Sequence, residues 1–338
     1  MTVTDGLSTL EPAVAPVQAG AGPWLRPWAG GLVAGAFWLG AGALTAVWPD
    51  ADDWAYTNEL AAAEAAGGTL LAVAGLLGSR AGVLFERLRR SAPWLIVLAL
   101  TLALWELLVA KLNLLPRPFF APPQAFLEVY LDDGRRLAEC AFASFGLLVV
   151  GYLLGALAGF VAGVAIGWSR AVAYWGHPLL RLIGPLPATA WLPIAFFAFP
   201  SSWSASVFLI ALASAIPVAV LTWSGVAGVN SAYYDIARTL GASPRFLVLR
   251  VAVPAAMPHV FVGLFMGLCM AFSVLVVAEM VGVKAGLGWY LQWAQGWAAY
   301  ANMYAALLVL ALVCSGLVGL LFRVRDRVLV WQKGLLKW

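Results

Sequence analysis

Long apolar segments alternate with short polar ones along most of this chain. A helix needs about 20 apolar residues to cross the hydrocarbon core of a bilayer. The segment 60–79 meets this requirement least well, because Glu64, Gly67 and Gly68 dilute it, and we expect Glu64 near a membrane surface. The pattern predicts an all-α integral membrane protein whose spans are residues 29–48, 60–79, 93–113, 140–168, 176–200, 205–226, 259–283 and 303–322.

The composition supports a location in lipid. Hydrophobic residues make up 63% of the 338 positions and charged residues 11%, whereas a soluble domain carries about 25% charged residues. Such a chain cannot cover a water-facing surface. Cysteines and histidines are few and widely spaced, which argues against disulfides, a metal site or a bound cofactor; they are Cys140, Cys269, Cys314, His177 and His259.

The basic residues set the expected orientation in the membrane. Lys and Arg are enriched in the cytoplasmic loops of membrane proteins. With a cytoplasmic N-terminus and eight spans, most of them fall inside, and both termini lie in the cytoplasm of a bacterial cell with the chain in its inner membrane. The inside then receives Arg26, Arg80, Arg87, Arg89, Arg90, Arg170, Arg238, Arg245, Arg250, Arg323, Arg325, Arg327, Lys333 and Lys337. This placement explains the net charge of +4 without a nucleic-acid partner.

A row of glycines marks the span 140–168. The glycines recur at every fourth residue, so they lie along one side of a helix; they are Gly151, Gly155, Gly159, Gly163 and Gly167. Without side chains, a second helix can approach closely. The row predicts a tight helix contact, which is either a moving interface of a transporter or static packing.

Prolines interrupt the span 176–200 at positions 178, 185, 187 and 193. Each interior proline removes a backbone donor and disturbs the preceding turn. Irregular backbone at membrane depth is tolerated where protein buries it or where it lines a cavity. The segment is therefore expected to line a permeation pathway or to form a kinked helix.

The polar insert Asp235 to Pro258 is the most informative segment. Asp235 and Arg238 are neighbours on one helix face. Gly241 can adopt positive φ and end a first short helix, and Ser243 can cap a second one. We expect two short helices outside the bilayer, after which Pro254 and Pro258 turn the chain back into it. Such an elbow indicates a surface for another protein.

The chain has no nucleotide-binding motif of its own. A P-loop needs Gly-Lys followed by Ser or Thr, and none of the four lysines follows a glycine. No catalytic group of residues emerges either, so the chain is not expected to be an enzyme. If ATP drives it, a separate subunit must bind the nucleotide, and the elbow provides the place for that contact.

The spacing of the insert resembles the EAA loop of ABC importer permeases, which reads Glu-Ala-Ala, three residues, Gly, nine residues, Ile-x-Leu-Pro. Asp235, Ile236 and Ala237 occupy the first positions and Gly241 the glycine, with Val251, Val253 and Pro254 at the end. From about Pro93 to Gln332 the chain is similar to permeases of the taurine, alkanesulfonate, nitrate and bicarbonate class. Further matches are Leu104 to Leu107, the glycine row, Gly184 to Pro187, Trp191 to Pro193, Val277 to Met280 and Gly286 to Tyr290.

This resemblance implies a six-helix type I permease core, dimerised around a central pathway, with two ATPase subunits below and a substrate-binding protein above. The first 90 residues depart from the family pattern and add two helices. The expected organisation is a tail 1–24, an extra two-helix segment 25–91, a core 92–332 and a tail 333–338. The coupling loop 228–258 would carry the ATPase contact through Asp235, Ala237, Arg238, Gly241, Ala242, Ser243 and Pro254.

Two intramembrane charges are candidate pathway or gate residues. A carboxylate inside the bilayer is expensive and faces a cavity or a partner, so Glu279 belongs either to an outer gate or to a loop contact near the outer surface. Arg181 either attracts an anion or anchors its helix at the interface.

The substrate class stays open at this point. The resemblance implies a small anion such as a sulfonate, nitrate or bicarbonate, with uncharged or cationic cargo as alternatives. A secondary transporter or channel without an ATPase partner is the rival function, and a membrane scaffold is another.

Overall fold

The structure is a computed structural model that describes residues 28–77, 82–116 and 118–331. Every regular element in these ranges is a helix. Seven helices are long and apolar enough to cross a membrane, and the pair α6 and α7, bent by 86°, would form an eighth span. The all-α membrane fold is confirmed. The predicted number of eight spans is reached in the described residues only if the bent pair counts as one span. The predicted tails 1–24 and 333–338, with Arg26, Arg80, Lys333 and Lys337, lie outside the described residues.

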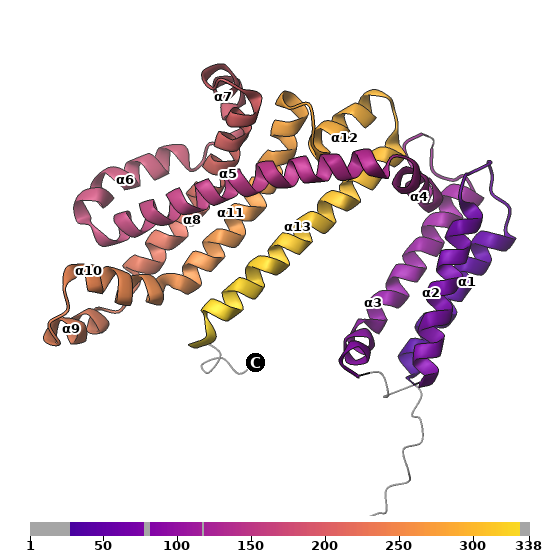
Figure 1. The fold of residues 1–338 in the computed structure, drawn as a ribbon, viewed down its shortest axis with the longest axis horizontal. Coiled ribbons are helices and arrows are strands. Elements are labelled where there is room, and N and C mark those ends of the chain that lie inside the picture. Colours follow the sequence, from indigo (N-terminus) through magenta and orange to yellow (C-terminus); the bar gives the residue numbers. More distant parts are fainter. Residues whose placement is uncertain (1–27, 78–81, 117, 332–338) are drawn as a thin grey trace, which may run out of the picture. The chain divides into compact units, whose positions relative to one another are not determined.

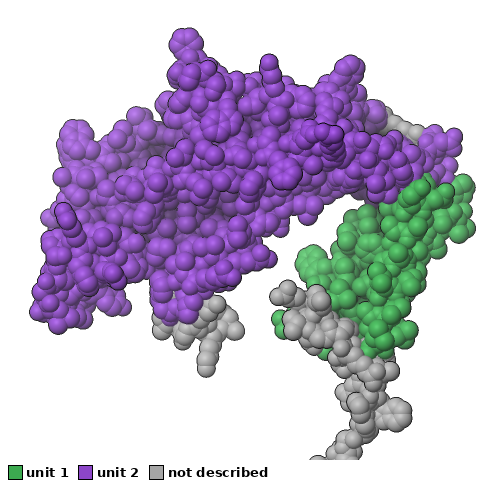
Figure 2. Space-filling model, viewed as in Figure 1, with its two compact units in different colours: residues 1–49, 57–104 green, residues 50–56, 105–338 purple. Residues whose placement is uncertain are grey.

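The chain forms two compact units, which Figure 2 shows in different colours. The first contains α1 (Ala29–Val47), α2 (Thr57–Leu77) and most of α3 (Gly82–Glu106). The second contains the loop 50–56 and everything from Trp105 onward. The predicted limit between extra segment and core, at residues 91 and 92, lies inside α3, whereas the compact units divide near the end of this helix, after Leu104. Within the first unit, Trp38 donates a hydrogen bond from Nε1 to the Leu95 carbonyl, 3.0 Å away, which ties α3 to α1.

The hairpin of α1 and α2 is held by small residues. A Cβ on Gly35 would lie 2.8 Å from the Gly68 carbonyl oxygen, so the two backbones touch. Glu64, which was expected near a membrane surface, is instead 2% exposed between the helices. Its Oε2 accepts a hydrogen bond from Thr45 Oγ1 at 3.0 Å. Close backbone approach encloses this carboxylate, and a hydroxyl partner makes its burial tolerable.

The second unit begins with the π-helical turn η2 (Leu107–Lys111) and the short helix α4 (Pro123–Asp132). Its frame is three long helices side by side, α5, α8 and α11 (Figure 1). The remaining elements connect these helices or flank them. The connecting and flanking elements are α6 (Arg170–Ile183), η3 (Ala188–Trp191), α7 (Leu192–Ala198), α9 (Ser231–Thr239), α10 (Pro244–Phe246), η4 (Leu247–Ala252), α12 (Leu287–Gly296) and α13 (Tyr300–Val328). The three frame helices are α5 (Gly134–Trp168), α8 (Ser202–Ala227) and α11 (Val253–Gly282).

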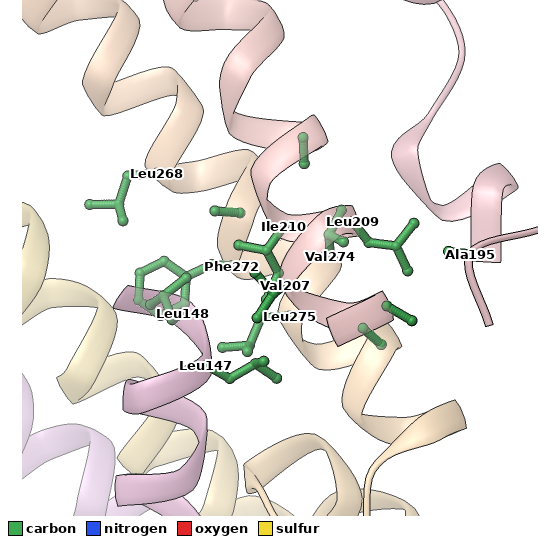
Figure 3. Packing of buried hydrophobic residues seen from close by; sticks show 14 residues of the cluster. Leu147, Leu148, Ala195, Val207, Leu209, Ile210, Leu268, Phe272, Val274 and Leu275 are labelled. Atoms are coloured by element: carbon green, nitrogen blue, oxygen red, sulfur yellow. The ribbon is translucent and has the colours of Figure 1, made fainter. Parts of the chain in front are cut away.

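The main apolar core lies where the three frame helices meet (Figure 3). Leu148 of α5, Ile210 of α8 and Leu275 of α11 are each at most 1% exposed, and Ala195 brings α7 onto the same cluster. In a bilayer this packing gains van der Waals contact between helices, because the lipid tails are as apolar as the side chains.

One expectation about the polar insert is wrong. The second short helix does not end before the bilayer, because α10, η4 and α11 form one helical run, Pro244–Gly282. Pro254 lies in the first turn of α11, directly after the π-helical turn η4, and Pro258 lies inside α11. A run of 39 residues is about 58 Å long, which exceeds the hydrocarbon core of about 30 Å. Its N-terminal part therefore extends beyond the membrane.

Candidate functional site

The elbow, residues 230–246, joins α8 to the long run that contains α11. Asn230 begins α9 by accepting a hydrogen bond from the Ala232 amide at 2.9 Å. The helix ends at Gly241, whose φ of +79° only glycine adopts at low cost. The Ala242 amide donates to the Ala237 carbonyl at 3.0 Å, which closes the turn. Ser243 then caps α10 by accepting from the Phe246 amide at 3.4 Å. The structure thus confirms that Gly241 ends the first short helix and that Ser243 caps the second.

One face of the elbow is apolar and open. Tyr233, Ile236 and Leu240 follow each other at helical spacing, so they share a face. Leu240 is 82% exposed. We call this set the apolar elbow surface: Tyr233, Ile236, Leu240, Phe246 and Leu249, all exposed. Asp235 and Arg238 form an exposed ion pair at 3.3 Å beside it. Large exposed apolar patches often mark surfaces that bind a protein or a membrane.

The opposite face of α9 packs on the helix bundle. Tyr234 contacts a small cluster of Val226, Ala252 and Ala256. Its ring also lies 5.8 Å from the ring of Trp168, at 67°, which is an edge contact. Burial raises the pKa of the Tyr234 phenol above its ordinary value, against a smaller lowering by Arg238. Tyr234 therefore fixes α9 to the end of α5.

The glycine row of α5 packs directly on α8. A Cβ on Gly151 would lie 2.7 Å from Ile210, and one on Gly163 would lie 2.6 Å from the Ala219 carbonyl oxygen. Gly155, Gly159 and Gly167 meet α8 in the same way. The close contact that the row predicts is present. Whether α5 moves along α8 stays a prediction.

The proline-rich segment is a broken helix that lines a cavity. Between α6 and α7 the chain bends by 86°. Pro185 and Pro187 stand in this break, and a cavity of about 350 Å³ lies between it, α8 and α11. The break of the predicted helix is thus observed, and the permeation pathway stays a prediction. The polar side chains in the lining belong to Thr189 and Ser273 among the described residues, and the lining contains neither Arg181 nor Glu279.

Glu279 holds the beginning of α12. Its side chain is 1% exposed. Oε2 accepts hydrogen bonds from Ser144 Oγ at 2.9 Å and from the Gly288 amide at 2.8 Å. Ser144 Oγ in turn accepts from the Leu287 amide at 2.7 Å. A carboxylate that receives the first amides of a helix satisfies donors that would otherwise be unpaired. The loop-contact alternative describes this geometry, and the gate role stays a prediction.

The structure separates the candidate residues into three places. The elbow residues lie in and around the turn between α9 and α10. The glycine row of α5 faces α8, and Glu279 of α11 contacts the start of α12. Arg181 is exposed on α6 and apart from all three. Sequence reasoning missed Ser144, Tyr234 and Trp168. The signal for Ser144 was a lone hydroxyl in an apolar span; Tyr234 and Trp168 gave none, because their contact spans 66 residues of sequence.

Comparisons with known proteins agree with this architecture. The chain is 31% identical to the nitrate import permease protein NrtB of Leptolyngbya laminosa over 183 residues, 52% of this chain and 65% of the relative. It is 32% identical to the bicarbonate transport system permease protein CmpB of Synechococcus elongatus over 144 residues, 41% of this chain and 51% of the relative. The matches thus span less than two thirds of these relatives' length.

A solved structure shares the fold. A chain of the MetNI methionine ABC transporter, in inward-facing conformations, matches 60% of this chain and 98% of its own length. The TM-score is 0.50 at 16% identity. A sequence family described as the binding-protein-dependent transport system inner membrane component matches residues 151–329. This match covers more than half of the 338 residues, and the chain therefore belongs to that family of inner-membrane transport components.

Proposed function

We propose that this chain is the membrane permease subunit of an ATP-driven importer for a small anion, and that its elbow binds a separate ATPase. The family and the nitrate and bicarbonate permeases among its relatives support transport of an anion. The chain carries no P-loop of its own. Nucleotide energy therefore has to enter through a protein contact.

The apolar elbow surface is the observation that carries this proposal. It lies at the end of the bundle where α8, α9 and the run Pro244–Gly282 meet, and its five side chains are all exposed. Leaving such side chains in water is unfavourable by about 25 cal/mol per Å². A groove on an ATPase that covers Ile236 and Leu240 recovers this free energy.

Each coupling residue has a definite role in this contact. The pair of Asp235 and Arg238 keeps α9 in register at the surface, and Gly241 sets the angle between the two arms of the elbow. Ala237 and Ala242 are small, so a partner can approach the turn. Ser243 and Pro254 define where the second arm begins and where α11 begins. Closure of the ATPase would then move the elbow as one body.

The remaining partners follow from the same function. Two ATPase copies, a second copy of this permease and a substrate-binding protein on the far side complete an importer. Arg238, Arg245 and Arg250 belong to the elbow region, and Arg170 lies two residues after Trp168, so basic residues gather at this end. Their position supports a cytoplasmic elbow and cytoplasmic termini, in a bacterial inner membrane.

The cavity at the α6–α7 break is the proposed place of passage. Thr189 offers a hydroxyl donor to an anion there, whereas the Ser273 hydroxyl donates to the Cys269 carbonyl, and the proline-broken backbone leaves polar groups along the path. Arg181 would attract an anion toward this segment, and Glu279 would fix the outer end by holding α12. Weak hydroxyl contacts suit a path that must release its cargo.

Purification of the tagged chain in mild detergent tests the proposal. An ATP-hydrolysing subunit should accompany the unmodified chain at equal stoichiometry. Leu240→Asp should reduce its recovery roughly tenfold, because a carboxylate in an apolar groove costs more than 1.4 kcal/mol. Leu131→Asp, an exposed apolar position in α4, should leave recovery unchanged. Absence of an ATPase from the unmodified complex, or full recovery with Leu240→Asp, would contradict the proposal.

A further inference from the structure

The elbow meets three frame helices but is covalently continuous with two. Residues 228–230 connect it to α8, and α10 and η4 lead from it into α11. The third helix, α5, ends at Trp168, and the chain then turns into α6. A displacement of the elbow reaches α8 and α11 through the backbone. It reaches α5 through non-covalent contacts, either by way of α8 or directly from side chains of the elbow.

Tyr234 makes that contact. Its ring packs on Val226 of α8, Ala252 of η4 and Ala256 of α11, and Val164 of α5 packs against the same cluster. The Trp168 ring meets it edge-on with 5.8 Å between centroids. An edge contact between aromatic rings is worth about 0.5–1.5 kcal/mol beyond the area it buries. Tyr234 is therefore the point at which all three helices meet the elbow.

The helix that Tyr234 contacts is stiff and leads to the cavity. α5 runs without a break for 35 residues, and its glycine row packs closely against the backbone of α8 and against side chains such as Ile210 and Val226. Ser169 caps α6 by accepting from the Val172 amide, so α6 begins where α5 stops. α6 ends at the break that lines the cavity. A shift of Trp168 therefore moves the N-terminus of the broken segment.

We infer that Tyr234 and Trp168 are positioning residues that carry the movement of the elbow to α5, and through α6 to the broken segment at the cavity. This inference rests on the proposed function of the elbow as the ATPase contact. Without the aromatic contact, the elbow still binds the ATPase and still pulls on α8 and α11. The cavity-lining segment would then no longer follow.

The test needs a readout that does not depend on the cargo. In a variant lacking Cys140, Cys269 and Cys314, Thr189→Cys places a thiol in the cavity lining. The rate at which a polar maleimide modifies it is measured in the purified complex with its ATPase, with and without ATP and vanadate. ATP with vanadate should change this rate, because trapping the closed ATPase moves the segment.

In this background Tyr234→Ala and Trp168→Ala should each reduce the nucleotide-dependent change in rate roughly tenfold, which corresponds to a coupling of about 1.4 kcal/mol. ATPase recovery and basal hydrolysis should stay unchanged. Tyr234→Phe keeps the ring and should behave as the unmodified protein. Trp175→Ala, an exposed tryptophan of α6 whose ring contacts Tyr174, is the matched control and should retain the change.

The outcomes are distinct. If the unmodified complex contains no ATPase, the proposed function fails and this inference fails with it. If the ATPase binds and Tyr234→Ala keeps the full nucleotide-dependent change, the inference alone is wrong. Should an alanine variant fail to assemble, the exchange of Tyr234→Trp with Trp168→Tyr restores an aromatic pair. If the double variant shows the nucleotide-dependent change in modification rate, the inference is supported. If the double variant and Tyr234→Phe both lack this change, the inference is wrong.

Discussion

The Nζ atom of Lys111 lies 2.7 Å from Oδ1 of Asp50, and the Lys111 side chain is fully buried. Asp50 belongs to the loop 50–56, which joins α1 to α2 but is part of the second unit. The Ala51 amide donates to the Ala110 carbonyl at 2.8 Å, beside this pair. Glu106 Oε1 lies 3.6 Å from the same ammonium group. The loop between α1 and α2 thus supplies the carboxylate of Asp50 to a buried ion pair of the second unit.

Asp50→Asn should destabilise the protein. Removing one partner of a buried ion pair costs about 3 kcal/mol, because the other charge remains in a low-dielectric site. The thermal denaturation midpoint in detergent should fall by roughly 5 °C or more. Asp53→Asn changes an exposed acid of the same loop and should leave the midpoint in place. Equal midpoints for the two variants would show that the pair contributes nothing.

Gly163→Ala should force α5 away from α8. Its Cβ would lie 2.6 Å from both the Ala219 carbonyl oxygen and the Thr222 Cβ, and neither can rotate away. Overpacking of this kind costs about 1–3 kcal/mol. Gly146→Ala, in the same helix, meets no described atom within 4 Å and should be neutral or slightly stabilising. Thermal aggregation midpoints of the two variants provide the comparison, and a neutral Gly163→Ala would contradict the contact.

Glu279→Ala should loosen the beginning of α12. The change leaves the Gly288 amide and Ser144 Oγ without their shared acceptor, at a cost of about 1–3 kcal/mol for each buried group. Hydrogen exchange at the Leu287 and Gly288 amides should accelerate. Glu279→Gln keeps an oxygen acceptor and should protect both amides. Glu139→Ala removes an exposed acid of α5 and is the control; unchanged exchange in Glu279→Ala would refute the role.

In the proposed importer, with nitrate as the test anion, Gly241→Val should abolish uptake while leaving the amount of protein in the membrane unchanged. The position has a φ of +79° but open space around it, so the penalty is backbone strain and not a clash. In this left-handed backbone conformation, a β-branched residue costs more than the penalty of about 1–2 kcal/mol for an ordinary L-residue. Gly241→Asn tolerates this φ and should keep uptake. Uptake of labelled nitrate with immunoblotting of membranes checks both, and normal uptake by Gly241→Val would refute the coupling role of the turn.

Local signals in the sequence predicted the elbow well. The αL glycine, the Ser243 cap and the Asp235–Arg238 pair depend on residues within four positions of one another, so spacing alone reveals them. The continuation of the second arm into α11 was not predicted, because a proline usually ends a helix. The π-helical turn η4 before Pro254 depends on packing against neighbouring elements, which no local pattern encodes.

Burial of polar groups was the other feature beyond the reach of local reasoning. Glu64 looks like a diluting charge in a weak span, yet Gly35 and Gly68 let two helices enclose it beside Thr45. Glu279 was identified as significant because an intramembrane carboxylate is expensive. Its partners come from α5 and from the loop after α11, and only the fold brings them to one point.

The sequence by itself determined the all-α membrane fold, the glycine contact face and the turn of the elbow, because these follow from hydrophobic length and from short-range backbone preferences. Tertiary structure decided which residues meet across long separations: Tyr234 with Trp168, Ser144 with Glu279, and Asp50 with Lys111. The reason is physical. Helix packing in a bilayer is set by the sum of many weak contacts and a few satisfied polar groups, and their pairing appears only when the helices are assembled.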